Sequence, residues 1–258
     1  MLLLVNGFLI FAYASTAWRD GQNAERIRHD TYAALTRLGI TLDEALLPER
    51  VSGLKPYRAN VNTVSDEASM RAILGECTVE NQGGGKRIYH GKEGEATLRG
   101  SEISLKINRS IRTENEARSF ATATLKTLGC KTDTMELVAP APDCVIETVG
   151  TLLNVPVFNA RLKFVFGEKI VTVTGTRLLY TLEATTGTVR DASELLLKLG
   201  AYWDARGAAK QTITGIIPGY LSEDAPNGGV SLTPGWEVRT DKGSWYLNAQ
   251  TGDVVTLQ

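Results

Sequence analysis

The amino end of the chain is an uncharged apolar stretch. Met1–Trp18 contains no charged residue, and the segment LLLVNGFLIFAY within it is almost wholly apolar. A helix over these residues would be roughly 27 Å long at about 1.5 Å per residue, close to the ~30 Å hydrocarbon core of a bilayer. The pattern predicts a transmembrane anchor over residues 1–18, with Trp18 at the membrane interface.

Two other interpretations of this segment stay open. A signal peptide would be cut after Ala12-Tyr13-Ala14, which has the small-x-small form of such sites. A buried core helix would show the same apolar run. No Lys or Arg precedes the run, so either the terminal amine alone sets the orientation or the true start lies upstream. No later stretch is apolar enough to span again, and we expect the remainder to form one extracytoplasmic body.

The spacing of apolar side chains beyond the anchor predicts four helices. They cover Ala24–Leu38, Ser65–Leu74, Glu114–Leu128 and Asp191–Arg206. Thr113 and Glu116 have the spacing of a capping box at the start of the third. The pattern Leu-x-x-Leu-Gly occurs at 35–39, 125–129 and 196–200, and we expect each copy to end a helix. The copies mark either a repeated helix-plus-sheet unit or a common way of ending helices.

Between the helices, short segments alternate apolar and polar residues and are separated by glycine turns. This pattern predicts antiparallel strands. The order of helix then strands, repeated along the chain, favours an α+β fold with two lobes of antiparallel sheet, each with helices packed on one face. We expect an N-terminal lobe over 19–110 and a C-terminal lobe over 111–258, with the boundary near Ser110.

Composition narrows the function classes. The 258 residues include 28 Lys+Arg and 29 Asp+Glu, a net charge of −1, and 43% are hydrophobic, as in ordinary globular chains. A near-zero charge gives no electrostatic footprint for nucleic acid, so no such partner is expected. Cys130 and Cys144 could form a disulfide if the chain is exported, or all three cysteines could stay unpaired as small hydrophobic residues.

No motif with catalytic spacing is found in the sequence. Gly83-Gly84-Gly85-Lys86 is followed by Arg87 and a strand pattern, whereas a phosphate-binding loop needs Ser or Thr at a helix start. The segment 229–233 lacks the second glycine of a nucleophile elbow. His29 and His90 are interpreted as solvated surface residues, and clustered zinc ligands are missing. We therefore expect no enzymatic activity, no cofactor and no metal.

The most specific segment is at the carboxyl end. Trp236 and Val238 alternate inward, Asp241-Lys242-Gly243 forms a turn, and Trp245 and Leu247 lie on the returning strand. We expect these four apolar residues to form the core of a hairpin rather than a ligand site. The pattern resembles the hairpin of PepSY-type modules, which are small non-catalytic α+β domains of exported bacterial proteins.

Further motifs extend this resemblance along the whole chain. After the anchor come Leu-x-x-Leu-Gly-Ile at 35–40 and Leu46-Leu47-Pro48, then GIIPGYL at 215–221 and Pro234-Gly235-Trp236. In this order they resemble the YycI family, membrane-anchored regulators that act with YycH on the WalK-type sensor histidine kinase of Firmicutes. That family has no catalytic residues.

This resemblance implies a membrane-anchored extracytoplasmic accessory regulator in the cell membrane. Its partners would be a WalK-type kinase and a YycH-like regulator, and binding one kinase state better than the other would shift its activity. The candidates for contact within the membrane are the small and polar residues of the anchor, Asn6, Gly7, Ala12 and Ala14. The alternatives are a secreted PepSY-like module that inhibits a peptidase or binds the cell wall, and an exported enzyme acting on wall polymers.

Overall fold

The computed structural model describes residues 23–48, 53–61, 64–140, 144–178, 180–208, 211–225 and 229–257. These residues fall into two compact units that are discontinuous in sequence. Unit 1 is drawn from Met1–Leu54, Gly187–Pro218 and Pro234–Gln258, and unit 2 from Lys55–Thr186 and Gly219–Thr233. Residue 110, where we expected a lobe boundary, lies within unit 2.

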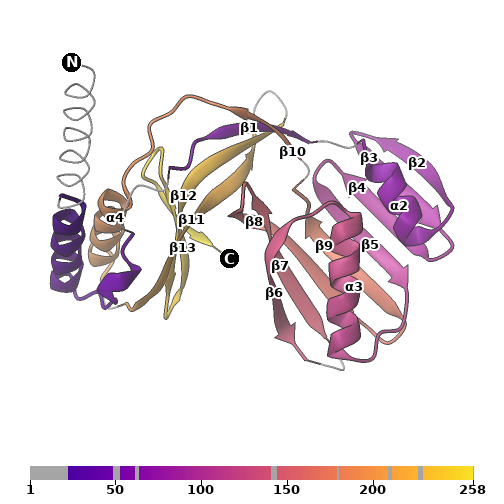
Figure 1. The fold of residues 1–258 in the computed structure, drawn as a ribbon, viewed down its shortest axis with the longest axis horizontal. Coiled ribbons are helices and arrows are strands. Elements are labelled where there is room, and N and C mark those ends of the chain that lie inside the picture. The colour runs from indigo at the N-terminus through magenta and orange to yellow at the C-terminus, as the bar shows by residue number, and fades with distance from the viewer. Residues whose placement is uncertain are drawn as a thin grey trace, which may run out of the picture. The chain divides into compact units, whose positions relative to one another are not determined.

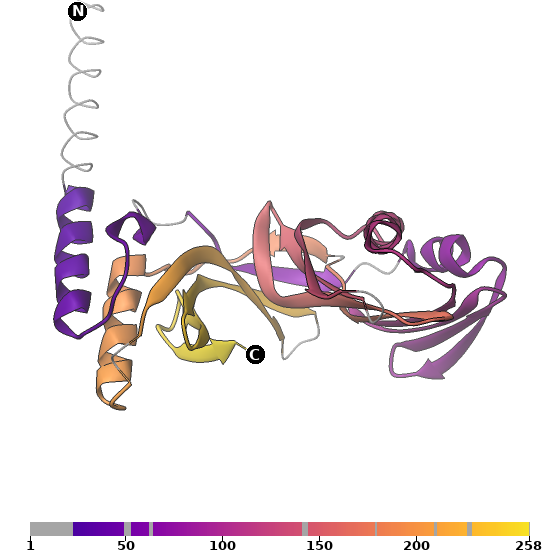
Figure 2. The same cartoon turned by 90° about the horizontal axis from the view of Figure 1, so that it is seen from below.

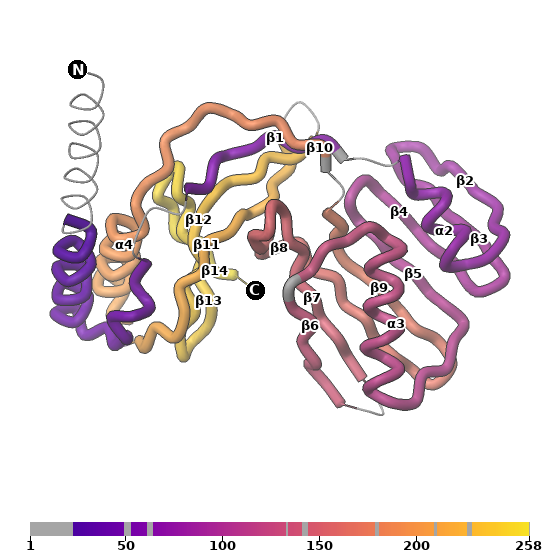
Figure 3. The backbone as a smooth tube through the Cα atoms, in the orientation of Figure 1, coloured from indigo at the N-terminus to yellow at the C-terminus, as the bar shows by residue number. Residues whose placement is uncertain are grey.

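Unit 2 contains two successive modules, each a helix followed by four strands (Figures 1 and 3). The first consists of α2 (Asp66–Leu74), β2 (Cys77–Gly83), β3 (Lys86–Gly91), β4 (Gly94–Arg99) and β5 (Glu102–Asn108). The second consists of α3 (Glu114–Thr127), β6 (Thr132–Ala139), β7 (Val145–Leu152), β8 (Val155–Phe166) and β9 (Ile170–Thr176). Within each module the strands pair in chain order as antiparallel meanders. The last strands, β5 and β9, pair with each other and join the modules.

The same order occurs a third time. It consists of α4 (Ala192–Asp204), β11 (Ile213–Asp224), β12 (Val230–Thr240), β13 (Gly243–Asn248) and β14 (Val254–Leu257), which again pair in chain order. Strands β11 and β12 each contribute residues to both units. The order of helix then strands is thus repeated three times, but the Leu-x-x-Leu-Gly motifs do not follow this repeat. The copy at 35–39 lies outside the three modules, and α2 of the first module has no copy.

The remaining elements lie outside the three modules. Residues 23–37 are helical and are followed by the 3-10 turn η1 (Glu44–Leu46). In unit 2, β1 (Tyr57–Val61) pairs antiparallel with β10 (Tyr180–Ala184) and with the first residues of β12.

The predicted fold class, an N-terminal transmembrane helix followed by two lobes of antiparallel sheet, is wrong. The described strands belong to one large mixed sheet, because β8 and β11 pair in parallel at Val157 and Tyr220. The side chain of Asn159 extends this contact, since it donates to the Ser222 carbonyl at 2.6 Å and accepts from the Ser222 N–H at 2.9 Å. Alternation along one strand cannot predict such a partner.

In the described ranges no helix is both long enough and apolar enough to cross a bilayer. Residues 1–18, with Asn6, Gly7, Ala12 and Ala14, lie outside those ranges.

The four predicted helices are confirmed to within about two residues at each end. Gly39 and Gly129 follow two of them with φ of 78° and 70°, as C-terminal stops should. The expectation that Gly200 also ends a helix is wrong, because it lies inside α4. A Cβ at Gly200 would lie 2.9 Å from the Leu38 side chain, so this glycine permits close packing against the end of the helix over residues 23–37.

Each unit has its own hydrophobic core. In unit 2, α2 and α3 lie together on one face of the sheet (Figure 2) and cover alternate strand residues such as Leu105, Val173 and Phe164. In unit 1, the core gathers around Leu35, Leu199 and Trp203. Alternation on β5 and β9 is clear because only their helix-side residues are buried.

A glycine in β12 tests the packing of unit 1. A Cβ at Gly235 would lie 2.3 Å from the Leu247 carbonyl oxygen and 2.4 Å from the Tyr246 ring. We predict that Gly235→Ala lowers the free energy of unfolding by about 1–3 kcal/mol, the usual range for overpacking. Gly215→Ala is the matched control, because its nearest neighbour would be 3.7 Å away. Urea unfolding of both variants checks this, and equal stabilities would contradict the packing described.

Candidate functional site

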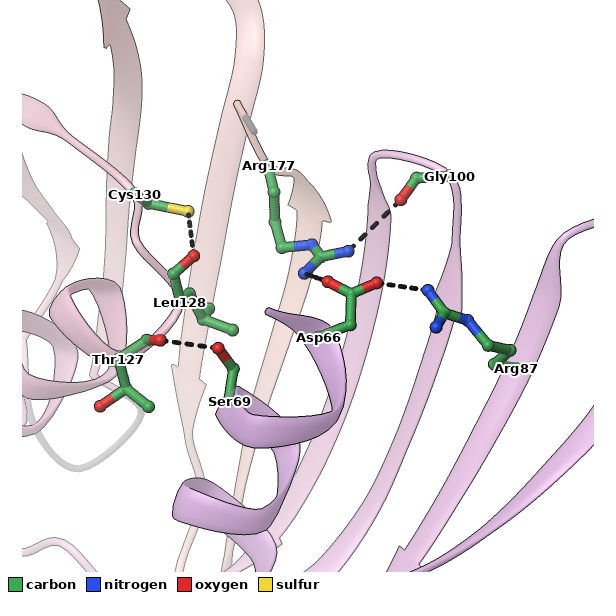
Figure 4. A network of polar contacts seen from close by, with 8 residues as sticks. All are labelled: Asp66, Ser69, Arg87, Gly100, Thr127, Leu128, Cys130 and Arg177. Atoms are coloured by element: carbon green, nitrogen blue, oxygen red, sulfur yellow. Dashed lines mark hydrogen bonds and ion pairs between the residues drawn. The ribbon is translucent and has the colours of Figure 1, made fainter. Parts of the chain in front are cut away.

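The most buried polar group of unit 2 is the carboxylate of Asp66, the first residue of α2. It is 0% exposed and lies between two guanidinium groups (Figure 4). Nη1 of Arg177 donates to Oδ1 at 2.7 Å, and Nη2 of Arg87 donates to Oδ2 at 2.5 Å. The helix N-terminus adds a partial positive charge, so positive charge faces the carboxylate from three directions.

Arg177 connects this carboxylate to the rest of the sheet. It follows β9 and is 1% exposed. Its backbone N–H donates to the Ser101 carbonyl at 2.8 Å, and its Nη2 donates to the Gly100 carbonyl at 3.3 Å. We call these connected groups the Asp66 network: Asp66, Arg87, Arg177 and the Gly100 carbonyl. The network joins α2, β3, the β4–β5 turn and the end of β9.

A second polar contact joins the two helices. The Ser69 hydroxyl on α2 donates to the Thr127 carbonyl at the end of α3, at 2.9 Å (Figure 4). Three residues later, the Cys130 thiol lies 3.9 Å from the Leu128 carbonyl. Burial raises the pKa of the Cys130 thiol to about 11, against smaller opposing effects of the Arg177 charge and the Leu178 N–H. The thiol is therefore neutral at physiological pH.

These groups do not form a reactive centre. Both oxygens of Asp66 accept from arginines, which keep their protons in proteins, so this carboxylate is not available as a general base. A neutral thiol is a poor nucleophile. In the ranges that the structure describes, no group of three His, Cys, Asp or Glu residues is placed to hold a metal. The Asp66 network and the contact between Ser69 and Thr127 are suited to stabilising the fold.

The histidines lie at the surface with acidic neighbours. On β3, the half-exposed His90 (49%) has Glu95 3.3 Å from its Nδ1 and Glu80 3.9 Å from its Nε2. Its neighbours in sequence include the basic residues Lys86, Arg87 and Lys92, but strand pairing brings carboxylates to it from β2 and β4. His29 has Glu44 at 3.6 Å. Cys77, Cys130 and Cys144 are all unpaired thiols.

The four predicted hairpin residues lie on β12 and β13. Trp236 pairs with Leu247 and Val238 with Trp245. Trp236, Val238 and Leu247 are buried in the core of unit 1, and the partly buried Trp245 packs edge-on against Trp203 of α4 with ring centroids 5.8 Å apart. Strict alternation does not hold, because Glu237 between the first two is buried as well.

Sequence reasoning missed the Asp66 network. In the sequence Asp66 lies in the first turn of a predicted helix, and Arg177 is 111 residues away. The sequence does contain one signal for this network. Arg177 directly follows the threonine-rich strand that ends at Thr176, and a charged side chain that is buried at a strand end needs a partner of opposite charge.

The edges of the sheet are a second candidate site. In the described chain β2 pairs only with β3, β6 only with β7, β10 only with β1 and β14 only with β13. Three of these edge strands carry an exposed valine: Val79 on β2, Val138 on β6 and Val255 on β14. Such edges present backbone N–H and C=O groups that another strand can pair with.

Comparison with known proteins identifies a fold. The chain is similar to an uncharacterized protein from Eubacterium rectale ATCC 33656, with a TM-score of 0.53 and 13% identity over 80% of this chain and 86% of that chain. Another structural neighbour is the Bacillus megaterium YpeB C-terminal domain, with a TM-score of 0.40 and 11% identity over 77% of this chain and 99% of that chain. No protein-family model and no curated protein matches the sequence. The first likeness shows a shared fold only.

The Asp66 network predicts a large effect of one substitution. Asp66→Asn removes the charge between Arg87 and Arg177 and leaves two poorly compensated cations, so unfolding should become about 3–5 kcal/mol easier. Glu67→Gln is the control, because its pair with Arg71 is exposed and should matter by well under ~1 kcal/mol. Denaturant unfolding measures both. A loss below about 1 kcal/mol for Asp66→Asn would show that the network does not stabilise unit 2.

The raised pKa of Cys130 predicts slow alkylation. The thiolate is the reactive form, so at pH 8.5 iodoacetamide should modify Cys130 at least about tenfold more slowly in the native chain than in urea. The native thiol keeps its proton longer than the unfolded one, so stability should fall as the pH rises from about 8.5 towards 11. Mass spectrometry of the Cys130 peptide measures the rate, and equal native and unfolded rates would disprove the shift.

Proposed function

We propose that the chain is a non-catalytic accessory protein that binds another protein through the free edge of its sheet at β2. The observation that carries this proposal is the exposure of β2, where every residue after Cys77 is exposed. The backbone groups on its outer side have no partner strand in the described chain, and adding a strand there would satisfy them.

β2 is also less protected than β6, another edge strand of unit 2. Natural edges are blunted by lysines, prolines, bulges or charges. β2 contains no Lys or Pro, and its only charged residue is Glu80. Its register shift lies at its end, between Asn81 and Gly83, whereas β6 is interrupted by two shifts. A partner strand would therefore meet an even ladder over Cys77–Asn81.

The partner that we propose is the extracytoplasmic domain of a WalK-type sensor histidine kinase, with a YycH-like regulator as a second partner. The YycI-like order of motifs supports this assignment. The C-terminal hairpin and the threefold helix-plus-strands order support the coarser assignment to PepSY-like modules. The chain would regulate by binding one state of the kinase better than another, and the difference in affinity sets the size of the effect.

Two matched substitutions test the proposal. Val79→Lys places a charge on β2, where Val79 is 46% exposed, and Val255→Lys does the same on β14, where Val255 is 45% exposed. We predict that Val79→Lys weakens binding of the kinase domain at least tenfold, while Val255→Lys changes it less than twofold. Biolayer interferometry with the full chain measures both, and circular dichroism checks the fold.

Each of the other outcomes contradicts one defined part of the proposal. If the unmodified chain does not bind the kinase domain, the assigned partner is wrong. If it binds and the two variants behave alike, the β2 edge is not the binding surface.

A further inference from the structure

The sheet of unit 2 has an open polar face. Both α2 and α3 lie on the same side of it (Figure 2), and the residues that point the other way alternate with the buried ones. On β5 these are Ser104 and Lys106, and on β9 Thr172 and Thr174. Hydroxyl groups from neighbouring strands therefore lie in rows on a surface that the helices do not cover.

Two cations stand at one end of these rows. Lys86 on β3 and Arg99 on β4 are cross-strand partners. Leu98 faces the helices and is buried in the core. Arg99, the next residue on β4, therefore points to the opposite face, and so does its cross-strand partner Lys86. Like charges directly opposite each other are unfavourable. In the described chain no carboxylate lies within ion-pair distance of either, although Glu102 faces Arg99 across the turn.

The surface is hollowed beside these cations. A depression of about 480 Å³ is lined by Lys86 and Arg99, by the hydroxyl residues Thr97, Ser104, Thr174 and Thr176, and by Glu102. This volume falls within the usual range for small-molecule sites. The lining combines cationic donors, hydroxyls that donate or accept, and one carboxylate that only accepts.

We infer that this hollow binds a phosphorylated polyol, with the phosphate between Lys86 and Arg99 and the ligand hydroxyls on the threonine and serine side chains. Phosphate oxygens accept charge-assisted hydrogen bonds from Arg and Lys, and a phosphate between the two cations relieves their repulsion. The Glu102 carboxylate accepts a hydrogen bond from a hydroxyl of the ligand. Inorganic phosphate has no polyol hydroxyl and therefore makes this contact less well. The site lies on another surface from the β2 edge and does not depend on the proposed kinase contact.

A titration of the full chain tests this inference. The probes are glycerol 1-phosphate, poly(glycerol phosphate), inorganic phosphate and glycerol, each followed by ¹⁵N–¹H correlation spectra. We expect saturable shifts of amides at 97–104 and 174–176 with the two phosphorylated polyols, and weaker binding of inorganic phosphate. Tighter binding of the polymer would identify a wall-type polymer as the source of the phosphorylated polyol. Equal binding per phosphate would identify a free metabolite as that source.

Three variants that each remove one positive charge complete the test. Lys86→Gln and Arg99→Gln should each raise the dissociation constant for glycerol 1-phosphate about tenfold. Lys106→Gln is the control, because Lys106 lies on the same face of β5 but does not line the hollow, and it should change the constant less than twofold. Thermal unfolding checks that all three fold. Binding that is absent, matched by glycerol, or reduced equally by all three variants would overturn the assignment.

Discussion

The pairing of one buried carboxylate with two arginines is the interaction on which unit 2 depends. Removing such charges from water costs several kcal/mol per ion, and the cost is offset only when every member is present and correctly oriented. Asp66, Arg87 and Arg177 come from α2, β3 and the segment after β9. Their pairing therefore ties the first helix-plus-strands module to the second, beside the β5–β9 ladder that joins their strands.

Because the two modules are joined in this way, some surfaces of unit 2 are covered by its helices and others remain exposed. The two helices of unit 2 share one face of the sheet and cover its apolar side chains. The meander of the first module runs outward to β2, so the edge strand and the polar face are left for other molecules. In the proposed function, binding occurs at these surfaces, while the most buried polar groups hold the modules together.

Local patterns in the sequence predicted local structure well. The helices over 66–74, 114–127 and 192–204 follow from apolar spacing and from caps, such as the Thr113 hydroxyl that accepts from the Glu116 N–H. Contacts between distant segments were not predictable. The parallel pairing of β8 with β11 is extended by the Asn159 side chain, which bonds both the N–H and the carbonyl of Ser222. A lone asparagine in a strand carries no signal for that role.

The candidate site was missed for the same reason. A charged residue is assigned to the surface by default, and only the fold brings Arg177 to Asp66. Gly200 shows a related limit, because the same Leu-x-x-Leu-Gly pattern ends two helices but continues through a third, where the glycine makes room for Leu38. Local sequence defines what a segment can form, and packing against distant residues decides between the possibilities.

Amide hydrogen exchange of the full chain, alone and with the kinase extracytoplasmic domain, tests the central claim most directly. It reports which backbone groups gain hydrogen bonds on binding. The account predicts that β2 amides exchange more slowly in the complex while β5 and β9, already paired on both sides, remain unchanged. Unchanged exchange in β2, with protection gained elsewhere, would contradict binding at this edge.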